Sequence, residues 1–164
     1  IVFETLGREV MAVAAARRVT PIGFGDFDPK AFLPGAPASG SQRVIDWLAD
    51  YTSKTAKTHS GIYRDLAVRK RKTEIDPQIG IISELGRERG VATPGLIELV
   101  ALIHDIEDGR RPMAFETFQR LIDTCTSAST MYGCLLAISC SARAAVLKSR
   151  RAVWGRAASI IACG

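Results

Sequence analysis

The stretch KTHSGIYRDLAVRKRKTEID, residues 57–76, constrains the fold most, because it contains two helix starts in close succession. Ser60 is placed to cap a helix over residues 61–69, and Thr73 is placed to cap a second helix. Asp76, three residues after Thr73, would complete an approximate capping box. Two neighbouring helix N-termini can direct several amide dipoles at one small anionic or polyhydroxyl ligand. The alternative is that both are ordinary caps on a surface turn.

The rest of the chain also has a helical period. Apolar residues recur at intervals of three and four along most of the sequence up to residue 123. Gly and Pro residues interrupt this pattern and mark the connections between helices. The sequence therefore predicts an all-α fold, with helices over residues 1–19, 41–53, 60–69, 74–89, 94–108 and 112–123.

The first two predicted helices are joined by a long loop. In the first helix, Leu6 and Val13 fall on the apolar face, whereas Glu4 and Glu9 are expected to face solvent. Ser41 is expected to cap the second helix.

The loop, residues 21–40, contains four prolines and four glycines. It also contains Phe24, Phe27 and Phe32, which we expect to anchor it to the core. A linker between domains is the alternative, but a solvated linker has little use for three phenylalanines.

The later helices have clear start and stop signals. Gly80 lies inside a predicted helix at a cost of about 1 kcal/mol relative to Ala, which suggests that another backbone or a ligand approaches closely there. Gly90 is placed to end that helix, and Thr93 with Pro94 is placed to begin the next one. His104 points away from the apolar face and is interpreted as a surface residue rather than a catalytic base.

The motif HSGIYRDLAVRKRKTEID is followed by Gly80 and by GVATP, residues 90–94. This order of residues resembles the C-terminal helical domain of the ketopantoate reductases (2-dehydropantoate 2-reductases). The resemblance covers roughly residues 1–123. It is specific, because many unusual residue choices recur in the right order. The matching positions are Ser60-Gly61-Ile62, Asp65, Arg69 to Lys72, Thr73-Glu74-Ile75-Asp76, Gly80 and Gly90-Val91-Ala92-Thr93-Pro94.

The resemblance implies a fold, an activity and site residues. The fold would be the multi-helix C-terminal domain of the 6-phosphogluconate-dehydrogenase-like or ketopantoate reductase type, over residues 1–123. In such enzymes an N-terminal Rossmann domain binds NADPH, and hydride passes from the nicotinamide to the 2-keto carbon of a small acid. A lysine general acid protonates the developing alkoxide.

By motif position, Ser60 would bind the substrate. Glu74 would be a cofactor-binding residue that accepts a hydrogen bond from cofactor or substrate hydroxyls. The alternative for Glu74 is stabilisation of the helix dipole in the first turn. A homodimer and a place in pantothenate biosynthesis are further expectations from the resemblance. A cytoplasmic location is expected from the cysteines, which are interpreted as reduced.

The sequence also departs from the family pattern. It contains no GxGxxG fingerprint and no Asn, and the catalytic lysine is expected on a helix upstream of Ile1. Lys54 and Lys57 lie on the wrong element for that role. We therefore expect a fragment that lacks the Rossmann domain, binds no NADP by itself and is inactive alone. The alternative is an independent helical protein-interaction module without a catalytic role.

The charge distribution argues against a nucleic-acid partner. All 17 acidic residues lie within residues 1–126, and the formal net charge of +5 belongs to the residues that follow. The basic run RKRK, residues 69–72, has acidic neighbours and no interleaved aromatic residues. A phosphate-rich cofactor is a better partner for this run than a nucleic acid, and plain solvated charge remains the alternative.

Residues 124–164 are predicted to be a divergent basic tail. They contain all 4 cysteines and no CxxC pair, so we expect neither a zinc site nor a disulfide framework. Three interpretations of the tail are an extra helix, a basic surface segment, or a read-through from an altered gene, and we favour the last. The sequence contains no apolar run long enough for a membrane span, and we expect neither a membrane span nor a secretory signal. The cysteines are Cys125, Cys134, Cys140 and Cys163.

Overall fold

The computed structural model describes residues 1–55 and 59–130, and within these ranges the chain is helical, as predicted. The only strand-like pairing in this part of the chain is an isolated bridge between Phe24 and Phe27. Ile1–Ser129 form one compact unit. The elements in order are α1 (Val2–Ala16), the 3-10 helix η1 (Pro29–Phe32), α2 (Ala38–Ser53), α3 (Gly61–Tyr63), the π-helices η2 (Arg64–Arg69) and η3 (Asp76–Gly80), α4 (Ile81–Glu88), α5 (Pro94–Glu107), and a helix over residues 115–130.

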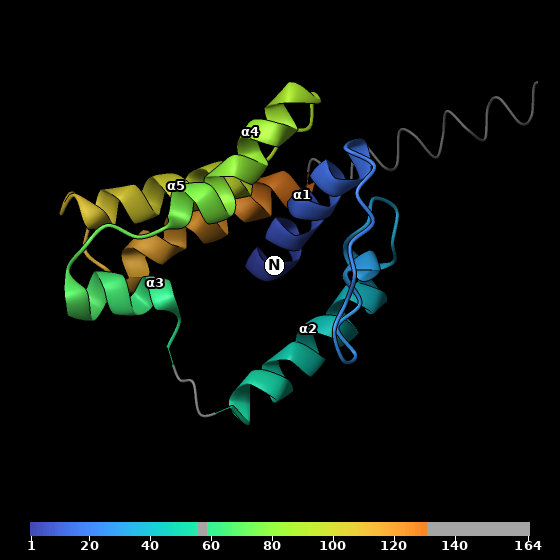
Figure 1. The fold of residues 1–164 in the computed structure, drawn as a ribbon, viewed down its shortest axis with the longest axis horizontal. Coiled ribbons are helices and arrows are strands. Elements are labelled where there is room, and N and C mark those ends of the chain that lie inside the picture. The colour runs from blue at the N-terminus through green and yellow to red at the C-terminus, as the bar shows by residue number, and fades with distance from the viewer. Residues whose placement is uncertain (56–58, 131–164) are drawn as a thin grey trace, which may run out of the picture. The chain divides into compact units, whose positions relative to one another are not determined.

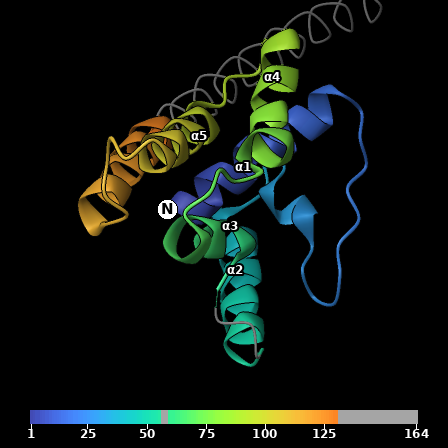
Figure 2. The ribbon, with the colours of Figure 1, turned by 60° about the vertical axis from the view of Figure 1, so that its left-hand side comes forward.

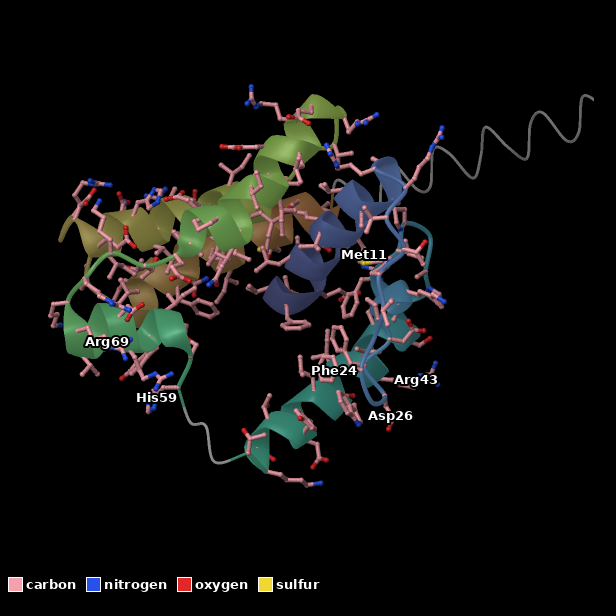
Figure 3. The ribbon with its side chains drawn as sticks, viewed as in Figure 1. Met11, Phe24, Asp26, Arg43, His59 and Arg69 are labelled. Atoms are coloured by element: carbon pink, nitrogen blue, oxygen red, sulfur yellow. The ribbon has the colours of Figure 1, made fainter. Side chains whose placement is uncertain are left out.

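Helix α1 is the central element of this unit. It contacts α2 and η1 on one side and α4 and α5 on the other, as Figures 1 and 2 show. Met11 packs with Phe32 and Val44 in one apolar cluster, and Figure 3 shows it on the side of α1 that faces the loop following this helix. Leu6 packs on a second cluster, which includes Cys125. One amphipathic helix thus joins two small cores.

Glu9 is buried, and the expectation that it faces solvent is wrong. Its Oε1 accepts the N–H of Gly95 at 2.9 Å, and its Oε2 accepts the N–H of Leu96 at 2.8 Å. These amides belong to the first turn of α5 and have no partner within their own helix. Thr93 precedes that turn but its side chain makes no capping bond. Burial raises the pKa of the Glu9 carboxyl, while the two N–H donors act in the opposite direction.

Ser41 lies inside α2, so the prediction that it caps this helix is also wrong. The helix begins earlier, at Ala38, and Ser41 is fully buried against α1. Its Oγ lies 2.7 Å from Oε1 of Glu4, which also accepts from Arg8 at 2.9 Å. Burial works to raise the pKa of Glu4, but the hydrogen bonds from Ser41 and Arg8 outweigh it, and the pKa is lowered.

Phe27 and Phe32 anchor the loop over residues 21–37 to the core, as predicted, whereas Phe24 is 53% exposed. Phe32 is only 2% exposed and lies in the Met11 cluster. Phe24 stacks on Phe27 with ring centroids 5.3 Å apart and contacts Trp47 of α2 edge-on at 5.9 Å. The linker interpretation does not fit this packing.

The expectation that another backbone or a ligand approaches Gly80 closely is wrong, and close contacts are found at Gly86 and Gly95 instead. A Cβ on Gly80 would meet only the side chain of Asp76, one turn earlier in the same helix. A Cβ on Gly86 would instead lie 3.0 Å from the carbonyl oxygen of Val91. A Cβ on Gly95 would lie 3.1 Å from Oε1 of Glu9. Gly90 ends its helix with a positive φ of 67°, in agreement with the prediction.

The predicted tail lies largely outside the described residues. Cys134, Cys140 and Cys163 are among the residues that the structure does not describe, whereas Cys125 is a free, buried thiol. The expected boundary at residue 123 falls within the helix over residues 115–130.

Candidate functional site

Ser60 caps a short helical segment, as predicted. Its Oγ accepts a hydrogen bond from the backbone N–H of Tyr63 at 3.0 Å. The rings of His59 and Tyr63 stack beside it, with centroids 4.3 Å apart. Ser60 is exposed, so its hydroxyl group is accessible to a ligand. Figure 3 shows His59 and Arg69 on the same green segment, which contains α3 and η2.

Asp65 fixes the end of this segment. Its Oδ1 accepts from Arg69 at 2.8 Å, which confirms the predicted pair, and from Arg71 at 2.9 Å. The backbone oxygen of Asp65 accepts the N–H groups of Lys70 and Arg71, so the chain turns sharply there. The hydrogen bonds from Arg71 and Arg69 lower the pKa of the Asp65 carboxyl. The chain after this turn runs past the C-terminal end of α5 (Figure 1).

Thr73 is held by α5 rather than by a local capping box. Oε1 of Glu107 accepts both the backbone N–H and the hydroxyl of Thr73, each at 2.7 Å. The Oγ1 of Thr73 accepts in turn from the N–H of Ile75 at 3.3 Å, so part of the predicted cap is present. Asp76 does not complete the box, because its Oδ2 lies 3.0 Å from Nε2 of His104. The predicted surface residue His104 thus connects α5 to η3.

Glu74 is exposed, whereas its neighbours are held in place: Thr73 is bonded to Glu107, and Ile75 is buried. Oε2 of Glu74 accepts from the side-chain amide of Gln78 at 3.2 Å. The hydrogen bond to Asp65 is the main cause of the raised pKa of Arg71, and the charge of Glu74 adds to it. No interaction within the described part of the chain joins the Glu74 and Ser60 side chains. The substrate-binding role of Ser60 and the cofactor-binding role of Glu74 therefore stay predictions.

A hollow of about 250 Å³ lies between the end of η2 and the end of α5. It has aliphatic and basic walls and one acidic side chain, and neither Ser60 nor Glu74 lines it. The residues that line it are Leu66, Lys70, Arg71, Ile106, Glu107, Arg111 and Met113.

The sequence did not reveal the contacts that bring these groups together. Arg71, Glu107 and Arg111 are separated by up to forty residues of chain, and their spacing follows no short motif. One sequence signal could have indicated this contact. Asp105, Glu107 and Asp108 lie close together near the end of α5, and their charge is opposite to that of the basic run over residues 69–72.

Comparison with protein families gives one result that bears on this site. The family described as Ketopantoate reductase PanE/ApbA C terminal matches residues 1–107, which is more than half of the chain. The chain belongs to this family. The match extends from α1 to the last residue of α5 and so includes Ser60, Glu74 and Glu107. Comparison with curated proteins and with solved structures found no match.

Membership of the ketopantoate reductase C-terminal family agrees with the all-helical architecture. Among the residues that the structure describes, no helix combines the length and the apolar character needed to cross a membrane. In the same part of the chain, no group of three or more histidine, cysteine or acidic side chains is arranged to hold a metal ion.

Proposed function

We propose that this chain is the C-terminal substrate-binding and dimerisation domain of an NADPH-dependent reductase that acts on a small, ketopantoate-like 2-keto acid. The family match over residues 1–107 carries the proposal. The matched residues include the exposed Ser60 and Glu74, which lie on either side of the Asp65 turn. The proposal includes a cytoplasmic location, with which the free thiol of Cys125 is consistent.

Ser60 would bind the substrate through its hydroxyl group. Because its Oγ accepts the N–H of Tyr63, the oxygen is held in place while the O–H can donate to a carboxylate or keto oxygen. The stacked ring of His59 limits where a substrate can approach. The general-acid lysine would come from a segment that this sequence does not contain.

Glu74 fits the ribose hydroxyls of NADPH but not its phosphates. It is an exposed acceptor with one described hydrogen bond, at Oε2. No glycine-rich phosphate-binding fingerprint occurs in the sequence, so the pyrophosphate would be held by the Rossmann domain. When bound, NADPH supplies the hydride. Glu74 would orient the cofactor and would transfer no proton.

A chimera tests the proposal directly. The full chain is joined to the N-terminal Rossmann domain of a ketopantoate reductase, including the lysine-bearing helix, and NADPH oxidation is followed with a panel of 2-keto acids. We expect turnover in the chimera and none with the chain alone. Ser60→Ala should raise KM, because it removes a donor to the substrate, whereas Ser53→Ala on α2 should not. A folded chimera that binds NADPH but reduces no 2-keto acid would contradict the proposal.

Dimerisation is tested separately by sedimentation equilibrium of the full chain. A reversible dimer would support this part of the proposal, and a monomer over the whole accessible concentration range would refute it.

A further inference from the structure

The hollow between η2 and α5 has two arginines whose positions are already fixed. Arg71 donates from Nε to Asp65 at 2.9 Å, and Arg111 donates from Nε to Asp105 at 2.9 Å. Within the described part of the chain, the terminal NH₂ groups of these two arginines have no hydrogen-bond partner. Each guanidinium is therefore oriented by a carboxylate through one edge and keeps its other donors for a ligand.

Lys70 is a third cation beside the hollow, and unlike the two arginines it has no ion pair with a described residue. Its backbone is left-handed, with a φ of 51°, which costs an L-residue about 1–2 kcal/mol. The N–H of Lys70 bonds to the backbone oxygen of Asp65, and this bond holds it in that conformation. Among the described residues, its ammonium group has neither an ion pair nor a hydrogen bond. The turn thus places a lysine without an ion pair next to Arg71 on the lining of the hollow.

The rest of the hollow suits the non-polar part of a ligand. Leu66, Ile106 and Met113 form aliphatic walls around a volume of about 250 Å³, enough for a few heavy atoms. Glu107 is the one carboxylate on the lining, and its Oε1 is occupied by two hydrogen bonds from Thr73. The lining thus carries three cations and one carboxylate. Arg71 and Arg111 are also ion-paired with Asp65 and Asp105, which do not line the hollow, so Lys70 supplies the unpaired positive charge.

We propose that this hollow binds a small organic oxyanion, a carboxylate or a phosphate group that carries a short aliphatic chain. Lys70, Arg71 and Arg111 would bind the charged group, and the chain would lie on the aliphatic walls. Neither Ser60 nor Glu74 lines this hollow, and the inference does not rest on the proposed reductase function.

Calorimetric titration of the full chain at low ionic strength tests the site. The probes are isobutyrate, isobutyl phosphate, inorganic phosphate and the neutral isobutanol. We expect saturable binding of at least one of the two organic anions and none of isobutanol. Binding of isobutyrate alone would assign a carboxylate, and binding of isobutyl phosphate alone would assign a phosphate ester. Tighter binding of isobutyl phosphate than of inorganic phosphate would show that the aliphatic walls contribute.

Substitution of Lys70 locates the binding. Lys70→Met should weaken binding about tenfold, because it removes one charge-assisted hydrogen bond, and Lys70→Arg should restore most of it. Lys30→Met, at an exposed lysine on η1, serves as the matched control and should leave the affinity unchanged. Far-UV circular dichroism confirms that each variant is folded. The proposal is overturned if neither organic anion binds saturably, or if Lys70→Met and Lys30→Met have the same affinity.

Discussion

The buried carboxylate of Glu9 gives the sharpest test of this structure. In Glu9→Ala, the N–H groups of Gly95 and Leu96 lose their acceptors in a site from which water is excluded. Each buried donor without a partner costs about 1–3 kcal/mol. For the two donors together the cost is in the range of about 2–6 kcal/mol. Burial of the Glu9 carboxylate is itself unfavourable, as its raised pKa indicates, so the net loss should lie in the lower half of this range. The free energy of unfolding should fall by about 3 kcal/mol.

Glu9→Gln should be less damaging, because a side-chain amide keeps one acceptor oxygen. It loses one of the two N–H bonds but also removes the cost of burying a charge, and we expect a loss of about 1 kcal/mol. The control is Glu88→Gln, at an exposed carboxylate that pairs with Arg17 at 3.0 Å; its cost should be below about 0.5 kcal/mol.

Urea denaturation followed by far-UV circular dichroism measures these effects. For an ordinary slope of about 2 kcal/mol per molar, the midpoint for Glu9→Ala should fall by roughly 1–2 M. Hydrogen exchange should show the largest loss of protection at the amides of Gly95 and Leu96. If Glu9→Ala and Glu88→Gln unfold at the same midpoint, the argument that Glu9 completes α5 is refuted.

Three further predictions follow from described contacts. Burial raises the Glu9 pKa above 4.5, so the folded state binds more protons than the unfolded state. The free energy of unfolding of the wild type, relative to that of Glu9→Gln, should therefore fall as the pH rises through the raised pKa. A difference that does not change with pH would contradict this. Glu107→Gln should speed amide exchange at Thr73, because a weaker, uncharged acceptor replaces the carboxylate, and unchanged exchange would exclude the contact. Gly86→Ala should cost about 1–3 kcal/mol, because its Cβ would lie 3.0 Å from a backbone oxygen. Gly80→Ala, whose Cβ would meet only the flexible side chain of Asp76, should leave the free energy of unfolding unchanged or raise it in the same urea denaturation assay.

The local features of this fold could be read from the sequence. Apolar periodicity predicted α1, α2 and α5, since each buries one face against its neighbours. The cap at Ser60 and the pair between Asp65 and Arg69 were predictable, because both partners lie within one helical turn.

The long-range polar contacts could not be predicted in this way. Glu9 looked like a solvent-facing residue because its acceptor role depends on where α5 lies, and the local pattern contains no information about that. Ser41 resembled a cap because Ser is favoured there, but Glu4 of another helix satisfies its hydroxyl group. For the same reason the hollow beside Lys70 was not foreseen. Its walls come from two segments that meet only in the folded chain.

The bond between Glu9 and the start of α5 also affects how the chain acquires its structure. The acceptor lies 86 positions before the amide of Gly95, so the first turn of α5 cannot be completed by residues translated near it. Closing so long a segment costs conformational entropy before any contact is gained. The first turn of α5 is therefore fully hydrogen-bonded only when α1 is in place, and the two helices should melt together as one cooperative step.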